Sequence, residues 1–159
     1  MNKNDLLLYV ITDCDHLQGE ELLKRTEQML QNGVTMLQYR DKHGQARNDA
    51  KALQELCKRY HVPFIVNDDV ALAVDLDADG VHVGQEDLAA ASARAQLGPD
   101  KIVGVTAKTL EQARKAVADG ADYLGVGALF HSVSKDSSLI SRDTLKEICA
   151  CLLYTSDAA

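Results

Sequence analysis

Residues 73–84 read Ala73-Val-Asp-Leu-Asp-Ala-Asp-Gly-Val-His-Val-Gly84, and residues 116–127 echo them as Ala116-Val-Ala-Asp-Gly-Ala-Asp-Tyr-Leu-Gly-Val-Gly127. In both stretches a segment of helical composition gives way to a short polar loop and then to an apolar run that suits a buried strand. A joint of helix, loop and strand that occurs twice indicates a chain built from repeated βα units. Such units form a parallel sheet.

The same alternation extends in both directions along the chain. Short apolar runs, each followed by a helical stretch, predict strands at residues 6–12, 35–40, 64–67, 80–83, 101–105 and 123–128. Nearly continuous apolar runs are typical of strands that are buried on both faces. The first strand is followed by Thr12-Asp-Cys-Asp-His16 and not by a glycine-rich dinucleotide fingerprint, which favours a barrel over a doubly wound sheet.

The predicted fold class is therefore α/β, of the (β/α)8 TIM-barrel type, here as an incomplete barrel of about six units. A full barrel needs roughly 200 residues or more, whereas this chain has 159. Residues 1–149 are expected to form the incomplete barrel domain. Residues 150–159 show no helix period and are expected to be a non-native tail, so the chain is expected to be truncated at its C-terminus.

Helix ends carry recognisable signals. Gly33, Gly98 and Gly120 follow three helical stretches at positions where a left-handed residue commonly ends a helix. Thr109 and Gln112 have the spacing of a capping box, which predicts that the junction between the fifth strand and the fifth helix lies near Ala107.

Composition limits the possible functions. The chain is 46% hydrophobic and 26% charged, which suits one globular domain. Its 17 Lys and Arg against 24 Asp and Glu give a formal net charge of −7, which argues against nonspecific binding of nucleic acid through a basic surface.

Location and redox state follow from what the sequence contains. The apolar run of residues 6–11 is too short to span a membrane and lacks the flanks of a signal peptide, so a cytoplasmic protein without membrane contact is expected. The four cysteines have neither Cys-x-x-Cys nor zinc-site spacing and are expected to be reduced structural thiols.

Polar residues at the ends of the predicted strands are the candidates for chemistry, because reactive groups of such barrels lie at the carboxyl ends of the strands. After the second strand, Gln38, Arg40 and Lys42 alternate with Tyr39 and Asp41, so an amide and two cations share one face. An arginine fork with a mobile lysine suits a diphosphate. The alternative is a solvated charged loop.

The third and fourth strands supply carboxylates. Asp68 follows Asn67 directly after the third strand, and Asp87 follows the fourth. Two carboxylates on adjacent strand ends predict an oxygen site for Mg²⁺. The alternative for Asp87 is that it caps the helix beginning at Leu88.

The fifth and sixth strands offer small residues and a polar loop. Gly104, Thr106, Gly125 and Gly127 are expected to leave space at the barrel mouth, the alternative being close packing of helices against these strands. The loop at residues 130–138 carries hydroxyls and a lysine that suit phosphate.

Two histidines lie in the segments just described. His82 is expected to face its neighbours inside the fourth strand, and His131 is the histidine of the loop that has functional interest.

Taken together, these motifs resemble thiamine-phosphate synthases over residues 8–148. The motifs are Gln38-x-Arg40-x-Lys42, Asn67-Asp68, Gly80-Val-His-Val-Gly-Gln-Glu-Asp87, Gly104-Val-Thr106 and Gly125-Val-Gly-Ala-Leu-Phe-x-Ser132-x-Ser134-Lys135. The resemblance implies a Mg²⁺-dependent transferase of thiamine biosynthesis. That family joins hydroxymethylpyrimidine diphosphate to a thiazole phosphate and releases diphosphate.

The resemblance also implies roles for individual residues. Asp68 and Asp87 would hold Mg²⁺, Ser132 and Ser134 would contact the thiazole phosphate, and the remaining motif residues would bind the pyrimidine diphosphate. That last set is Gln38, Tyr39, Arg40, Asp41, Lys42, Asn67, Thr106 and Lys135. The family's reaction is dissociative, so Arg40 and Lys135 are the expected catalytic residues, acting on the charge of the departing diphosphate.

Two alternative functions stay open at this point. One is a thiazole tautomerase, which resembles the synthases in fold but lacks the complete pyrimidine-diphosphate set. The other is a non-catalytic fragment that binds phosphate. In each case the expected partners are small molecules, and self-association into a homo-oligomer stays open.

Overall fold

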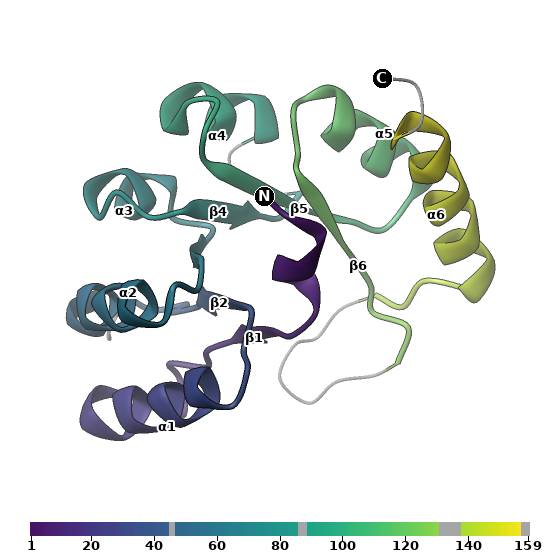
Figure 1. The fold of residues 1–159 in the computed structure, drawn as a ribbon. Coiled ribbons are helices and arrows are strands. Elements are labelled where there is room, and N and C mark those ends of the chain that lie inside the picture. The colour runs from purple at the N-terminus through teal and green to yellow at the C-terminus, as the bar shows by residue number, and fades with distance from the viewer. Residues whose placement is uncertain (45–46, 86–88, 131–137, 157–159) are drawn as a thin grey trace.

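A computed structural model of the 159-residue chain describes residues 1–44, 47–85, 89–130 and 138–156, with side chains as far as Cys151. The chain alternates strands and helices from end to end (Figure 1). Its elements are η1 (Lys3–Leu6), β1 (Tyr9–Ile11), α1 (Gly19–Gln31), β2 (Met36–Tyr39), α2 (Arg47–Tyr60), β3 (Phe64–Asn67), α3 (Val70–Asp75), β4 (Gly80–Val83), α4 (Ala90–Leu97), β5 (Ile102–Ala107), α5 (Leu110–Ala118), β6 (Tyr123–Val126) and α6 (Arg142–Ser156).

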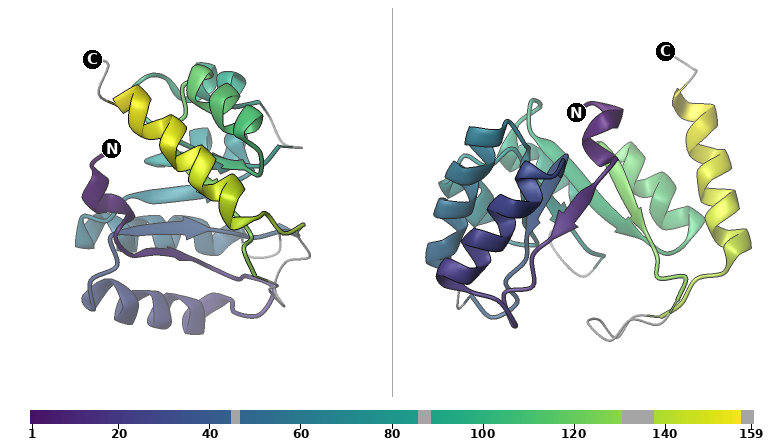
Figure 2. Two further views of the ribbon diagram at one scale, coloured as in Figure 1. Left: turned by 90° about the vertical axis from the view of Figure 1, so that its right-hand side faces the viewer. Right: turned by 60° about the horizontal axis from the view of Figure 1, so that its bottom comes forward.

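The six strands form one parallel sheet in the order β1-β2-β3-β4-β5-β6. The sheet curls, and the α-helices line its outer side (Figures 1 and 2). Six βα units in a curled half-barrel confirm the predicted fold class. No helix within the described part of the chain combines the length and the apolar character needed to cross a membrane.

The two similar stretches, residues 73–84 and 116–127, form the same hydrogen-bond pattern at two places in the sheet. The backbone N–H of Phe64 donates to the carboxylate of Asp79 at 2.8 Å, and that of Val103 donates to the carboxylate of Asp122 at 2.8 Å. Each aspartate also donates its own N–H back to the carbonyl of the same strand residue, at 3.0 and 2.8 Å. A carboxylate thereby extends the hydrogen-bond ladder at the amino end of the sheet, which explains why the motif recurs.

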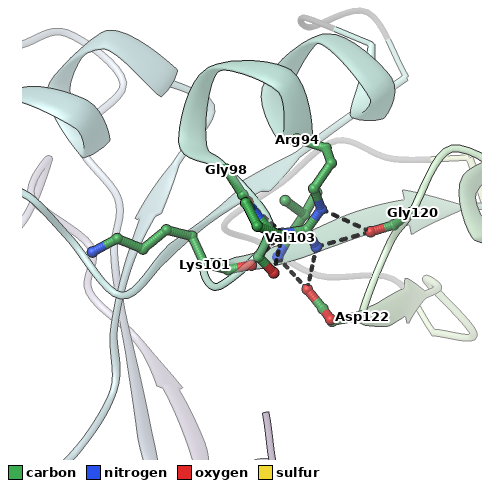
Figure 3. A network of polar contacts seen from close by, with 7 residues as sticks. Arg94, Gly98, Lys101, Val103, Gly120 and Asp122 are labelled. Carbon is green, nitrogen blue, oxygen red and sulfur yellow. Dashed lines mark hydrogen bonds and ion pairs between the residues drawn. The ribbon is translucent and has the colours of Figure 1, made fainter.

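Arg94 of α4 fastens the same end of the sheet (Figure 3). Its guanidinium donates to the Asp122 carboxylate at 2.6 Å and to the Gly120 carbonyl at 2.9 Å. It also donates to the carbonyls of Gly98, at 3.0 Å, and Lys101. We call Arg94, Gly98, Lys101, Gly120 and Asp122 the basal cluster, because it joins the loops that lead into β5 and β6.

Alternation along each strand separates two cores. Outward residues such as Leu37, Phe64 and Val81 pack under the helices. Inward residues form a second cluster, consisting of Met36, Ile65, Ile102 and Tyr123, with Tyr9 packed against it.

Inward glycines make room for large inward side chains. A Cβ at Gly80 would lie 2.2 Å from the Ile102 carbonyl oxygen, and one at Gly104 would lie 2.1 Å from Cζ of Tyr123. The space expected at Gly104 is therefore not open, because the Tyr123 ring fills it.

Several element boundaries differ from the sequence expectations: β5 runs on to Ala107, β6 stops at Val126, and larger differences lie at β1 and at the last helix. β1 begins at Tyr9 because Asn2 and Asp5 close a capping box around the 3-10 turn η1, so the first apolar residues are not in a strand. The last helix runs to Ser156, since no proline or glycine interrupts the chain after Arg142.

The predicted helix signals hold. The N–H of Gln112 donates to the Thr109 hydroxyl at 3.1 Å, while the Gln112 side chain accepts from the N–H of Lys108 at 2.7 Å, one residue earlier than in a regular capping box. Gly98 has φ 86° and Gly120 has φ 89°, the left-handed region expected of helix-ending glycines.

All four cysteines are free, as predicted. Burial raises the pKa of the Cys57 thiol to about 12 and also raises the pKa of Cys14. These two thiols are therefore protonated core residues at neutral pH.

Candidate active site

A cavity of about 710 Å³ opens on the inner face of the curled sheet. It extends from the first residues of β1 and β6 to the carboxyl ends of the strands. Its lining consists of Leu6, Tyr9, Ile11, Thr12, Asp13, Gln38, Arg40, Asn67, Asp68, His82, Gly84, Thr106, Lys108, Tyr123, Leu124, Gly125, Val126, Gly127 and Ala128.

The second strand contributes Gln38 and Arg40 to this cavity, as the alternation predicts. Gln38 is buried, and its Nε2 donates to the Tyr9 hydroxyl at 2.6 Å. The backbone N–H of Arg40 donates to the Thr12 hydroxyl at 2.9 Å, which holds the end of β2 against the end of β1. Lys42 lies beyond the strand, is exposed and is not among the lining residues, so its predicted role in substrate binding stays a prediction.

Tyr39 and Asp41 do not share the cavity with Gln38. Tyr39 points to the opposite side of the sheet and stacks on Phe64 with ring centroids 6.3 Å apart. Its hydroxyl donates to the Asp41 carboxylate at 2.9 Å, and burial, followed by the contact with Asp41, raises the pKa of the phenol. The structure gives this pair a packing role. Substrate binding by either residue stays a prediction.

Asn67 and Asp68 are held at the end of β3 by an unusual backbone conformation. Asp68 has φ 62°, a left-handed value that aspartate tolerates better than most residues. Its N–H donates to the His82 carbonyl at 2.8 Å, and the Asn67 amide donates to its carboxylate at 2.5 Å. Backbone strain of this kind is often found at functional sites. Here it accompanies a carboxylate at the cavity wall.

The fit of this wall to Mg²⁺ can be tested on the donor set. Among the described residues, no group of three or more His, Cys, Asp or Glu side chains could hold a metal ion. Mg²⁺ differs from most metals in that it keeps several waters and is commonly held by one or two carboxylates plus substrate phosphates. Asp68, with a neighbouring amide oxygen at Asn67, fits that mode of binding. Neighbouring Asp69 instead caps α3 by accepting the N–H of Leu72 at 2.8 Å.

Thr106 lies at the carboxyl end of β5, where it was predicted to bind substrate, and its partner is His82. Nε2 of His82 lies 2.9 Å from Oγ1 of Thr106, and Nδ1 lies 3.0 Å from the Tyr123 hydroxyl. The expectation that His82 faces its neighbours within the strand is too narrow, since its ring spans β5 and β6 and also lines the cavity.

Several lining residues were missed by the sequence analysis. Tyr9, Tyr123 and His82 share a signal that could have found them, because each is a large polar residue at an inward position of an otherwise apolar strand. Asp13 and Lys108 also line the cavity, and Lys108 donates to the Ser138 hydroxyl at 3.1 Å. Their loop positions carried no comparable signal.

The described charged groups of the cavity are balanced in sign. Two cations, Arg40 and Lys108, face two carboxylates, Asp13 and Asp68. Neutral donors and small residues make up most of the remaining wall. This arrangement suits a diphosphate bound with a divalent cation better than a diphosphate alone.

Five residues named by the sequence analysis lie outside the described part of the chain. These are Asp87, His131, Ser132, Ser134 and Lys135. Their assigned roles stay predictions.

Comparisons with known proteins show the family to which the chain belongs. The family model described as thiamine monophosphate synthase matches residues 8–155. The chain belongs to the thiamine monophosphate synthase family. It is 45% identical over 152 residues to the thiamine-phosphate synthase of Clostridium tetani, covering 92% of this chain and 73% of that protein. The enzyme of the same name from Clostridioides difficile is 45% identical over 150 residues, which cover 92% of this chain and 71% of that one.

A solved structure supports the same assignment. The thiamine phosphate pyrophosphorylase of Pyrococcus furiosus superposes with a TM-score of 0.77 at 35% identity, covering 91% of this chain and 70% of that chain. Members of this family are transferases.

Proposed function

We propose that the chain carries the active site of a thiamine-phosphate synthase. The reaction joins hydroxymethylpyrimidine diphosphate to a thiazole phosphate and releases diphosphate. One observation carries the proposal: residues at the ends of β2, β3 and β5 all line one cavity, namely Gln38, Arg40, Asn67, Asp68 and Thr106. Family membership independently supports the same reaction.

The described residues divide the work by chemistry. The Arg40 guanidinium offers a planar fork of donors for the diphosphate, and Asn67 offers an amide beside it. Asp68 would hold Mg²⁺, with Asp87 as the second predicted ligand. When bound, Mg²⁺ neutralises negative charge on the diphosphate as it departs.

The neutral part of the cavity has a different role. Gln38 and Thr106 would contact the pyrimidine ring, because an amide and a hydroxyl match a heterocycle better than a phosphate, and Tyr9 and His82 line the wall beside them. The Ile11 side chain adds apolar surface to this part of the cavity, beside the carbon that loses the diphosphate. Bond breaking then depends on electrostatics more than on a positioned acid or base.

Two other functions receive less support. A thiazole tautomerase would not need Gln38, Arg40 and Asn67 together in one cavity. A protein that binds phosphate without turnover would need the cations but not the neutral part of the wall. A cytoplasmic location and the oligomeric state stay predictions from the sequence.

The decisive experiment measures diphosphate release by the full chain given both substrates and Mg²⁺. Arg40→Ala and Asp68→Ala should each lower the rate by about 100-fold, the usual effect of removing a group that stabilises transition-state charge. Arg59→Ala is the matched control, because Arg59 is an exposed arginine of α2 that pairs with Glu27 at 3.9 Å. It should leave the rate unchanged.

Calorimetric titration separates the alternatives. Binding of hydroxymethylpyrimidine diphosphate that requires Mg²⁺, together with turnover, supports the synthase. Binding without any turnover would overturn the synthase proposal for this chain in favour of a phosphate-binding protein. Turnover that is equal in Arg40→Ala and in the control would refute the assigned site.

A further inference from the structure

A continuous line of hydrogen bonds crosses the inner face of the sheet. The Gln38 amide donates to the Tyr9 hydroxyl at 2.6 Å, and the Tyr9 and Tyr123 hydroxyls are 2.7 Å apart. Tyr123 is 3.0 Å from Nδ1 of His82, whose Nε2 is 2.9 Å from the Thr106 hydroxyl. We call these five residues the relay. Its two ends, Gln38 and Thr106, are residues that the proposed function assigns to the pyrimidine diphosphate.

The chain makes room for the relay with glycines. The Tyr123 ring occupies the place of a side chain at Gly104, where a Cβ would meet it at 2.1 Å. A Cβ at Gly125 would approach the His82 ring to 3.0 Å. The Tyr9 and Tyr123 rings meet edge to face with centroids 5.7 Å apart. Packing therefore holds both phenol rings and the imidazole ring in fixed positions on the inner face of the sheet.

Proton counting gives the relay a direction. A phenol hydroxyl has one proton to donate. Tyr9 accepts from Gln38, so the arrangement in which every proton of the line is used sends the Tyr9 proton to the Tyr123 oxygen and the Tyr123 proton to Nδ1 of His82. A neutral imidazole that accepts at Nδ1 carries its proton on Nε2 and donates it to Thr106.

Both phenols keep their protons at neutral pH. Burial raises the pKa of Tyr9 and the pKa of Tyr123 above the ordinary value for tyrosine. At neutral pH each phenol therefore still has the one proton that the direction of the relay requires.

The two ends of the relay offer opposite hydrogen-bonding groups, one an acceptor and the other a donor. At one end, the Gln38 amide nitrogen is committed to Tyr9, and within the described residues its carbonyl oxygen accepts no hydrogen bond. At the other end, Thr106 accepts from His82, so its hydroxyl proton is left to donate. A ligand in the cavity thus meets an acceptor at Gln38 and a donor at Thr106.

We infer that Tyr9, Tyr123 and His82 are positioning residues that fix this polarity, and thereby select a heterocycle presenting a donor to Gln38 and an acceptor to Thr106. The inference rests on the proposed function, because it assigns the ring of the pyrimidine diphosphate to this wall. An aminopyrimidine carries both kinds of group, an amino donor and ring-nitrogen acceptors. The diphosphate itself would be bound at Arg40, so its binding would not depend on the donor and acceptor that the relay leaves at its ends.

The first test needs no ligand. Two-bond proton–nitrogen NMR correlation of the uniformly ¹⁵N-labelled chain distinguishes the two neutral tautomers of histidine, and His82→Gln identifies the signal. The expected result is a neutral His82 with its proton on Nε2 at pH 7.5. A proton on Nδ1, or a doubly protonated ring, would overturn the polarity whether or not the chain is a synthase.

The second test measures what the polarity does. Calorimetry with Mg²⁺ compares hydroxymethylpyrimidine diphosphate with inorganic diphosphate, which has no ring. Tyr9→Phe keeps the ring but frees the Gln38 amide to rotate, so it should weaken binding of the pyrimidine ligand about tenfold, as for one buried hydrogen bond left unmade. Binding of inorganic diphosphate should change less than twofold.

A matched control removes a phenol hydroxyl outside the relay. Tyr60 accepts from Gln31 at 3.1 Å and donates to Glu27 at 3.2 Å, away from the cavity, so Tyr60→Phe should affect neither ligand. Equal weakening of both ligands by Tyr9→Phe would show a merely structural role and overturn the inference.

The two proposals can fail separately. If the unchanged chain prefers the pyrimidine ligand over inorganic diphosphate and Tyr9→Phe keeps that preference, the inference fails while the proposed function stands. If the unchanged chain shows no such preference, the proposed function and the selective role of the relay fail together.

Discussion

The basal cluster and the relay both join neighbouring strands of the sheet, yet they do so with opposite chemistry. The basal cluster is charged, and each of its carbonyl and carboxylate acceptors is satisfied by Arg94. The relay consists of neutral groups, and its two ends leave an acceptor and a donor directed to the cavity. The basal cluster thus uses its polar groups for stability. The relay, on the inner face, keeps two of its groups for a ligand.

This difference follows from where each network lies. The loops at the amino end of the sheet present unpaired backbone carbonyls, and one guanidinium with five donors can satisfy several of them. On the inner face the backbone is already paired, so only side chains remain to be satisfied. Neutral side chains can be buried there at lower cost than charged ones. Removing a member should therefore lower stability at the amino end and alter recognition at the relay.

The largest expected effect is that of Arg94→Ala. It leaves the carbonyls of Gly98, Lys101 and Gly120 and the Asp122 carboxylate without their shared donor. The free energy of unfolding in urea should fall by about 3 kcal/mol, a value near the lower bound for a broken buried pair, because the Arg94 side chain is 21% exposed. At temperatures at which the variant is folded, calorimetry should show an unchanged affinity for hydroxymethylpyrimidine diphosphate. Weakened binding would contradict the division between the two regions.

A second prediction concerns the glycine beneath Tyr123. Gly104→Ala forces the ring aside and should lower the free energy of unfolding by about 2 kcal/mol, the usual cost of overpacking. It should also weaken pyrimidine binding, because Tyr123 then no longer aligns with His82.

Gly80→Ala is the matched comparison for that prediction. Its Cβ would meet the Ile102 carbonyl oxygen at 2.2 Å, so it should also destabilise the fold, but it does not touch the relay. Equal loss of binding in the two variants, measured by calorimetry below their melting temperatures, would show that destabilisation alone explains the effect.

Alkaline pH should act on the relay but not on the basal cluster. Burial raises the pKa of Tyr9 and of Tyr123, so the unfolded chain loses these phenol protons at a lower pH than the folded one. Their stabilising contribution is complete below pH ~10 and falls above it by about 1.4 kcal/mol per pH unit for each phenol. Tyr9→Phe should make this slope shallower, by at most that amount, in urea titrations between pH ~10 and ~11.

The matching variant of the basal cluster gives the control for this slope. Arg94→Ala removes no group that loses a proton in that range, so its stability should fall with pH as steeply as that of the unchanged chain. A slope that Tyr9→Phe leaves unaltered would mean that the Tyr9 phenol ionises as it does in water.

The sequence predicts the scaffold better than the site, and particular residues show why. Strand period and glycine punctuation are local properties, so β3 and β4 are predicted to the residue. Gln38, Arg40 and Thr106 are found because polar residues at strand ends are conspicuous. The relay was missed because it depends on register between strands: Tyr9 and Tyr123 are 114 positions apart in the sequence.

The smallest expected effect separates the regions by their response to salt. Asp122→Asn keeps an oxygen for the Val103 N–H but removes the charge that faces Arg94 at 2.6 Å. Raising NaCl from about 0.05 M to about 1 M shortens the screening length to roughly 3 Å, so the stability difference between this variant and the unchanged chain should shrink by about 0.3 kcal/mol. The difference for Tyr9→Phe should stay constant, because the relay contains no charge for ions to screen. If salt altered both differences alike, the relay would have to carry charge, and the neutral His82 on which its polarity depends would be wrong.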